Sequence, residues 1–172
     1  HNVDYYPANG GDPNVTVGPD IPAGDSGPFD LINFADGSPV HARLGLSLGA
    51  FGFLSVNDAA GGTDADSIFG GIINADGTWT TPLNQSLNGA SYIVVDHLVP
   101  GQRYALRLYL TGTSAEGVQR LTLEGAAQYT NASSAGVGDN GDADDATLTI
   151  DASTNQTNGY VAGWSGIVAG GD

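Results

Sequence analysis

The sequence predicts an all-β protein, a jelly-roll-like antiparallel β-sandwich that carries an extended N-terminal arm. Glycine (27) and proline (8) punctuate short apolar stretches along the 172 residues, which is typical of strands joined by turns. No segment holds apolar side chains at helical spacing over three turns. Several stretches instead alternate apolar and polar residues, the period of a strand with one buried face. A chain of this length can hold one such domain.

The arm spans residues 1–36 and the sandwich domain spans residues 37–172. Five prolines interrupt the arm, and it has too few apolar residues to bury a core of its own. It is an arm, a linker or a strand that pairs elsewhere, for example as a donor strand in a second copy. Its strand-capable pieces supply the candidate assembly residues Tyr5, Tyr6, Val15 and Val17.

Alternation places the strands of the sandwich domain. The first is clear from Val40, where every second residue up to Leu48 is apolar. The full set of expected strands is 40–48, 51–56, 68–73, 91–98, 103–110, 118–124, 147–151 and 160–168. Turn signals separate several of them, namely Asp76-Gly77, Asn88-Gly89, Pro100-Gly101 and Asn158-Gly159. About eight strands at this spacing are typical of a sandwich or barrel.

The most regular alternation, at 103–110, directs its leucines inward and Arg103, Arg107 and Tyr109 outward. The strand at 118–124 likewise directs Arg120 outward. If the two form a hairpin through 111–117, three of the four arginines share one sheet face. That face is either a solvent-exposed polar surface or a binding surface.

The composition of the chain narrows the classes of molecule that it can bind. Acidic residues outnumber basic ones 19 to 4, and the formal net charge is −15. A chain this acidic repels phosphate groups, which disfavours nucleic acid as a binding partner. The same charge attracts divalent cations or suits a salty medium. Cysteine is absent, so no disulfide contributes. No apolar run reaches the length of a membrane span. The start at His1 suggests either a mature extracellular or cell-surface form after signal-peptide removal or a trimmed chain.

Two acidic loops predict calcium sites. Alternating Asp and Asn in a glycine-containing loop can direct several oxygens at one hard cation, although neither loop has the EF-hand order. The alternative is a solvated, turn-forming loop. The candidate ligands are Asp139, Asn140, Asp142, Asp144 and Asp145 in one loop and Asp58, Asp64 and Asp66 in the other.

The sequence offers no catalytic constellation, and we expect no enzyme. Asp96 and His97 are neighbours in a predicted strand, which would direct their side chains to opposite faces. A copper site formed by His1 with His41 or His97 is a third class of function. Trp79 is either structural or a platform for a sugar, and Trp164 is expected in the core.

Two segments carry a family resemblance. Residues 98–110 (LVPGQRYALRLYL) and 117–125 (GVQRLTLEG) resemble paired strands of malectin-like and related carbohydrate-binding jelly rolls, and the resemblance covers about 70 residues of the second half. It implies a jelly-roll fold and glycan binding. In that alternative the ligand-binding candidates are Trp79, Arg107, Tyr109 and Arg120.

A second, looser resemblance is to self-assembling prokaryotic extracellular tube and fibre subunits of the cannula type, which are also small, exported and acidic. It implies a terminal arm that adds a strand to the next subunit. We therefore expect a secreted structural subunit that forms a homopolymeric filament or tube, with Ca²⁺ at acidic loops. A carbohydrate-binding module is the alternative.

Overall fold

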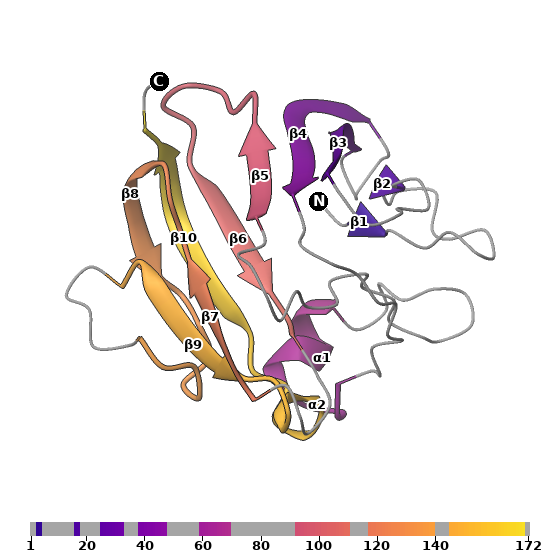
Figure 1. The fold of residues 1–172 in the computed structure, drawn as a ribbon, viewed down its shortest axis with the longest axis vertical. Coiled ribbons are helices and arrows are strands. Elements are labelled where there is room, and N and C mark those ends of the chain that lie inside the picture. The colour runs from indigo at the N-terminus through magenta and orange to yellow at the C-terminus, as the bar shows by residue number, and fades with distance from the viewer. Residues whose placement is uncertain are drawn as a thin grey trace. The chain divides into compact units, whose positions relative to one another are not determined.

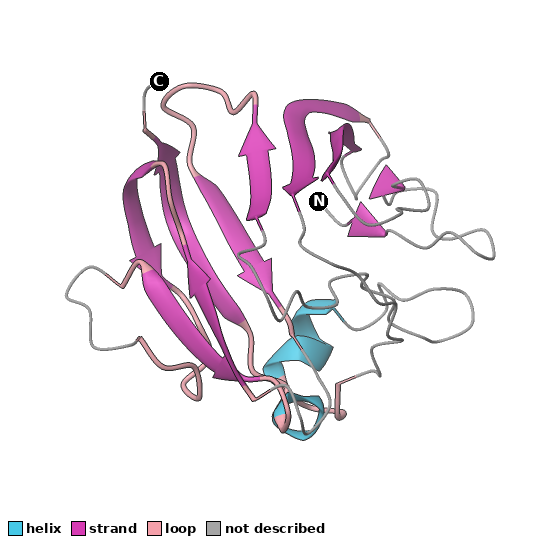
Figure 2. Cartoon of the chain, in the orientation of Figure 1, coloured by secondary structure: helices cyan, strands magenta, loops and turns pink. Residues whose placement is uncertain are grey.

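The structure, a computed structural model, describes residues 3–4, 16–17, 25–32, 38–47, 59–69, 92–110, 117–139 and 145–170. These residues form mostly β-strands in antiparallel sheets, with two short helices (Figure 2). The all-β prediction is confirmed, whereas the jelly-roll order of the strands stays a prediction. No helix in the described part of the chain has the length and apolar character needed to cross a membrane. The chain divides into two compact units, 1–57 with 71–99 and 58–70 with 100–172.

The first unit contains a three-stranded antiparallel sheet in the order β3 (Asp25–Ile32), β4 (Pro39–Ser47) and β5 (Tyr92–Asp96). β4 and β5 match the strands expected at 40–48 and 91–98. β3 lies inside the predicted arm and pairs with β4, so part of the arm joins a sheet of its own chain.

The rest of the described arm is short. β1 (Val3–Asp4) and β2 (Thr16–Val17) pair in parallel over two residues each, and β2 lies against β3. Tyr5, Tyr6 and Val15 lie outside the described residues.

The second unit contains two antiparallel sheets (Figure 1). One has the order β6 (Tyr104–Leu108), β10 (Ala162–Ala169) and β8 (Ala126–Asn131), and the other pairs β7 (Val118–Thr122) with β9 (Thr147–Asp151). Side chains from both sheets share one core, whose buried members are Leu148, Ala162, Trp164 and Ile167. The predicted core position of Trp164 is confirmed.

The pairing differs from the predicted hairpin. β6 pairs with β10, and β7 pairs with β9, so the strands expected at 103–110 and 118–124 are not partners. Alternation indicates which face of a strand is buried, but it contains no information about the partner strand. Here both partners come from the last third of the chain.

The strand expected at 68–73 is wrong where the structure describes it, because Ile68 and Phe69 end helix α1 (Asp64–Phe69). Thr63 caps this helix: its Oγ1 accepts a hydrogen bond of 3.3 Å from the backbone N–H of Asp66. Asp66 Oδ2 in turn accepts one of 2.8 Å from the N–H of Gly62. This reciprocal arrangement satisfies amide groups at a helix start. Residues 70–73 and the strand expected at 51–56 lie outside the described residues.

Helix α2 (Asn155–Asn158) holds the segment 59–69 within the second unit. The N–H of Ala60 donates to the carbonyl of Gln156 at 3.0 Å, and the N–H of Ala65 donates to that of Gly159 at 2.9 Å. Ala59, Ala65 and Val161 form a second, smaller buried cluster.

Candidate functional site

The exposed strand β5 is the first candidate site. Four consecutive large apolar side chains of this strand are exposed: Tyr92 (52%), Ile93 (37%), Val94 (50%) and Val95 (36%). β5 stands at the end of its sheet, where β4 is its partner among the described strands. The other edge of β5 therefore presents backbone donors and acceptors beside an apolar surface.

Features that usually protect an edge strand are missing from Tyr92–Asp96. Natural edges are blunted by lysine, proline or a bulge. β5 contains none of these residues, and its five pairs with β4 run without a register shift. Short uncharged segments of β-branched and aromatic residues readily pair with further strands. β5 is therefore competent to accept a strand.

The charged end of β5 is internally neutralised. Arg43 of β4 donates from Nε and Nη2 to the two carboxylate oxygens of Asp96, each at 3.1 Å. The hydrogen bonds from Arg43 have the largest effect and lower the pKa of Asp96 below its ordinary value. Desolvation acts in the opposite direction, and the hydrogen bond with His97 adds a smaller lowering effect.

The expectation that Asp96 and His97 face opposite ways is wrong. β5 ends at Asp96, and His97 adopts a left-handed conformation with φ of 58°. This turn brings Nδ1 of His97 to 3.0 Å from Oδ1 of Asp96. The strand rule that separates neighbouring side chains applies only while the backbone stays extended.

The second candidate site is a pair of arginines beside β10. The backbone of β10 is irregular in the middle, with register shifts against β6 between Trp164 and Ile167 and against β8 between Ser165 and Val168. Gly166, in this bulge, has φ of 61°, a conformation that favours glycine. Bulges of this kind reorient side chains and occur often beside functional sites.

Arg107 crosses β10 at the start of the bulge. Its Nη1 donates hydrogen bonds to the backbone carbonyls of Leu106 at 3.1 Å and Trp164 at 3.0 Å. A Cβ at Gly163 would lie 2.7 Å from Cδ of Arg107, so only glycine allows this path. Arg103 reaches the other end of the bulge, because a Cβ at Gly166 would lie 3.3 Å from its Nη1.

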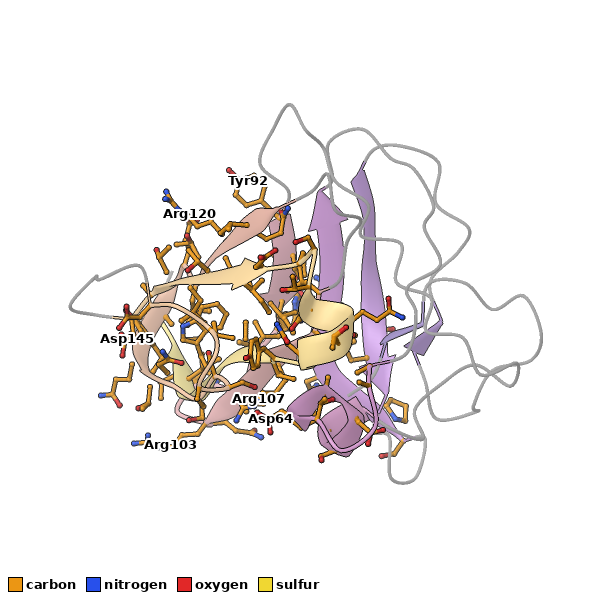
Figure 3. The ribbon with its side chains drawn as sticks, turned by 90° about the horizontal axis from the view of Figure 1, so that it is seen from below. Asp64, Tyr92, Arg103, Arg107, Arg120 and Asp145 are labelled. Atoms are coloured by element: carbon orange, nitrogen blue, oxygen red, sulfur yellow. The ribbon has the colours of Figure 1, made fainter. Side chains whose placement is uncertain are left out.

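Among the described residues, the predicted ligand-binding arginines Arg107 and Arg120 lie in different sheets. Arg120 is exposed on β7 in the other sheet, and Figure 3 places it on the opposite side of the unit from Arg103 and Arg107. Tyr109 packs against the small cluster of Ala59, Ala65 and Val161. Trp79 lies outside the described residues.

The acidic loops are described only in part. Asp139 is exposed, and Asp145 is half-buried with φ of 53°; Asn140, Asp142 and Asp144 lie outside the described residues, as does Asp58. Asp64 and Asp66 are in the first turn of α1, where Asp66 caps the helix start. The described ranges contain no group of three or more His, Asp or Glu side chains placed to hold a metal ion.

Sequence reasoning missed both the bulge and the exposure of β5. Gly163 and Gly166 inside an apolar strand pattern are a recognisable bulge signal. The run of four apolar residues at 92–95 reads equally well as a strand buried on both faces.

The chain matches no known protein family, no curated protein and no solved structure.

Proposed function

We propose that this chain is an extracellular structural subunit that assembles with copies of itself by strand addition. The observation that carries the proposal is the exposed and regular edge of β5, whose residues 92–95 carry no charge. A strand that joins this edge gains backbone hydrogen bonds, and its side chains pack beside the apolar side chains of residues 92–95 on both faces of the sheet. The jelly-roll body is part of the same proposal.

The net charge of the subunits favours a narrow contact through one strand over a contact between two wide surfaces. Each subunit has a formal net charge of −15, so two wide surfaces repel each other at low ionic strength. Residues 92–95 carry no charge, and Arg43 pairs with the adjacent Asp96. Ca²⁺ at the acidic loops would further reduce repulsion between subunits, as the sequence of residues 139–145 suggests.

The proposed donor is the N-terminal arm of a second copy. In the first unit β2 lies against β3, whereas β5 is at the other end of the β3–β4–β5 sheet. A contact between the arm of one copy and β5 of the next joins two different surfaces. Such heterologous contacts generate filaments or closed rings, whereas a self-complementary contact stops at a dimer.

Electron microscopy and light scattering test the proposal with three proteins, each with Ca²⁺ and with a chelator. They are the full chain, a variant lacking residues 1–24, and Val94→Lys. The truncation stops before Asp25 so that β3 keeps its pairing with β4. Of these three proteins we expect ordered polymers from the full chain alone, and we expect the control variant Val118→Lys to polymerise as the full chain does. Val118→Lys is the matched control, because Val118 is 68% exposed in the other unit.

Mixing the two variants tests the direction of the contact. Val94→Lys retains a donor arm, and the truncated protein retains an intact β5 edge. We expect each alone to be monomeric and the mixture to form a one-to-one complex that grows no further. A full chain that stays monomeric in every condition contradicts the proposed function.

A second candidate function, glycan binding of the malectin-like type, is favoured by a different observation. Arg103 and Arg107 lie beside the bulge of β10. The neighbouring strand of the same sheet carries exposed polar side chains. A glycan-binding screen of the monomeric variant tests it. Binding that depends on these arginines supports this function, and the absence of any glycan ligand excludes it.

A further inference from the structure

The arginines at the bulge have no acidic partner among the residues that the structure describes. The chain has 19 acidic residues and only four arginines, so an arginine on its surface meets carboxylates readily. Arg43 forms an ion pair with Asp96, whereas the described carboxylates leave Arg103 and Arg107 without one. Their positive charge is therefore available to an external group.

The sheet beside these arginines has no acidic residue in its three strands; Arg107 lies in β6 and Arg103 directly precedes it. β6, β10 and β8 contain no Asp or Glu. Beside the bulge, the register sets exposed Thr130 opposite Ser165 and exposed Gln128 opposite Val168. These side chains are neutral, and Thr130, Ser165 and Gln128 can hydrogen-bond to hydroxyl groups. The described surface around the bulge therefore carries two positive charges and neutral polar groups on a strongly acidic chain.

Arg107 is preorganised. Two backbone carbonyls hold its Nη1, and its stem lies over Gly163. The guanidinium group has five N–H donors, so Nε and Nη2 remain for a ligand. A side chain fixed before binding loses little rotamer entropy when the ligand arrives.

The spacing of the two arginines selects the kind of anion. Three residues lie between them, and the four steps from Arg103 to Arg107 along an extended chain place their Cα atoms about 13 Å apart at about 3.3 Å per residue. The two side chains also approach different glycines of the bulge, because a Cβ at Gly163 would lie 3.0 Å from Nη1 of Arg107 and a Cβ at Gly166 would lie 3.3 Å from Nη1 of Arg103. A ligand that carries more than one anionic group can therefore engage both arginines at once.

We propose that Arg103 and Arg107, with the neutral polar side chains around the β10 bulge, bind a carboxylate-bearing polysaccharide of the uronate type. A uronate chain combines spaced carboxylates, which arginine recognises by charge-assisted hydrogen bonds, with hydroxyls for Ser165, Thr130 and Gln128. An acidic peptide supplies carboxylates without the hydroxyls. This inference rests on the glycan-binding function proposed above and names its ligand class.

Titration calorimetry with a galacturonate trimer, at physiological ionic strength and with a chelator present, tests the proposal. Arg103→Gln is the informative variant, because the Arg103 side chain is exposed and Arg107 supports the bulge itself. We expect its affinity to fall at least about tenfold, the loss of one charged hydrogen-bonding group. We also expect the monomeric sugar acid to bind at least about tenfold more weakly than the trimer.

Arg120→Gln is the matched control. Both substitutions remove one arginine and change the formal net charge from −15 to −16, but Arg120 lies in the other sheet. We expect Arg120→Gln to bind as the unchanged chain does. Equal losses in both variants mean non-specific attraction and overturn the proposal.

Two further ligands separate the remaining outcomes. A neutral glucose trimer that binds as tightly as the uronate overturns the anionic assignment but keeps the glycan-binding function. A peptide of residues 139–145 that binds more tightly than the uronate makes the face an interface between copies of this chain and overturns the proposal. Absence of binding by any sugar contradicts both the inference and the glycan-binding function.

Discussion

Arg43 and Asp96 form a bidentate hydrogen-bonded ion pair, in which Nε and Nη2 of Arg43 each lie 3.1 Å from one carboxylate oxygen of Asp96. The pair joins β4 to β5 at directly opposed positions. Arginine and carboxylate geometries match in this arrangement, which adds orientation to attraction. The last charged residue of the exposed strand is thereby neutralised within its own sheet.

The first prediction concerns the titration of Asp96. The hydrogen bonds from Arg43 lower its pKa in the folded chain, so its contribution to stability is present above the unfolded pKa of about 3.9 and is lost as the pH falls through the lower folded value. NMR titration should find the Asp96 pKa below 3.8. Arg43→Gln should raise this pKa, and Arg120→Gln should leave it unchanged. An Asp96 pKa that is insensitive to Arg43→Gln contradicts the prediction.

The second prediction concerns Asn155, which is fully buried. Its Nδ2 donates to the carbonyls of Leu110 at 2.8 Å and Tyr160 at 2.9 Å, and its Oδ1 accepts from the N–H of Tyr160 at 2.8 Å. Asn155→Ala leaves these groups without their partner and should cost about 2–4 kcal/mol in the free energy of unfolding.

Asn155→Asp should destabilise more than Asn155→Ala, because a carboxylate oxygen would face two carbonyl oxygens in a buried position. Urea unfolding measures both variants. Asn158→Ala is the control, since Asn158 is exposed and its Nδ2 bonds, among the residues that the structure describes, to Oγ1 of Thr154 alone; it should cost less than about 1 kcal/mol. The reverse order of the Asn155 variants would contradict this account.

Alternation was sufficient to predict most strands but not their partners. Leu121 and Leu148 alternate with exposed or half-exposed polar residues in β7 and β9, because one face of each strand covers the core. That signal is local. The choice of β9 as the partner of β7 depends on segments far apart in the sequence, and so does the covering of Tyr109 by residues 59–69.

Other features of the structure have a local signal in the sequence, but the hydrophobic pattern at the same place favoured a different prediction. Thr63 followed by Asp66 is a capping pattern, yet the apolar pair Ile68-Phe69 favoured a strand. The outward direction of Arg103 followed from alternation, whereas its approach to Gly166 depends on the bulge. The burial of Asn155 had no signal, since asparagine beside a glycine-containing turn usually indicates an exposed loop.

The third prediction concerns Trp164, whose side chain is buried in the core shared by the two sheets of the second unit. Its Nε1–H donates to the carbonyl of Asp145 at 2.9 Å. Trp164→Ala should cost about 3–5 kcal/mol in the free energy of unfolding. Trp164→Phe keeps most of the packing and loses the hydrogen bond, so it should cost less. Chemical unfolding followed by circular dichroism compares the two; equal costs would mean that packing is not the larger effect.

The fourth prediction concerns Gly159, where the backbone and a neighbouring side chain both require glycine. Its φ is 60° at the end of α2, and a Cβ there would overlap the side chain of Thr63. Gly159→Ala should therefore combine backbone strain of about 1–2 kcal/mol with displacement of residues 59–69. Hydrogen exchange should report faster exchange at the amide of Ala65, which bonds to the carbonyl of Gly159.

Gly101→Ala separates the two effects. Gly101 has φ of 76°, and a Cβ added to it meets no atom within 4 Å. This variant should show the backbone strain alone and leave exchange at Ala65 unchanged. If Gly159→Ala costs no more than Gly101→Ala, the close approach of Thr63 to Gly159 does not limit this position, and the segment 59–69 is held by its other contacts.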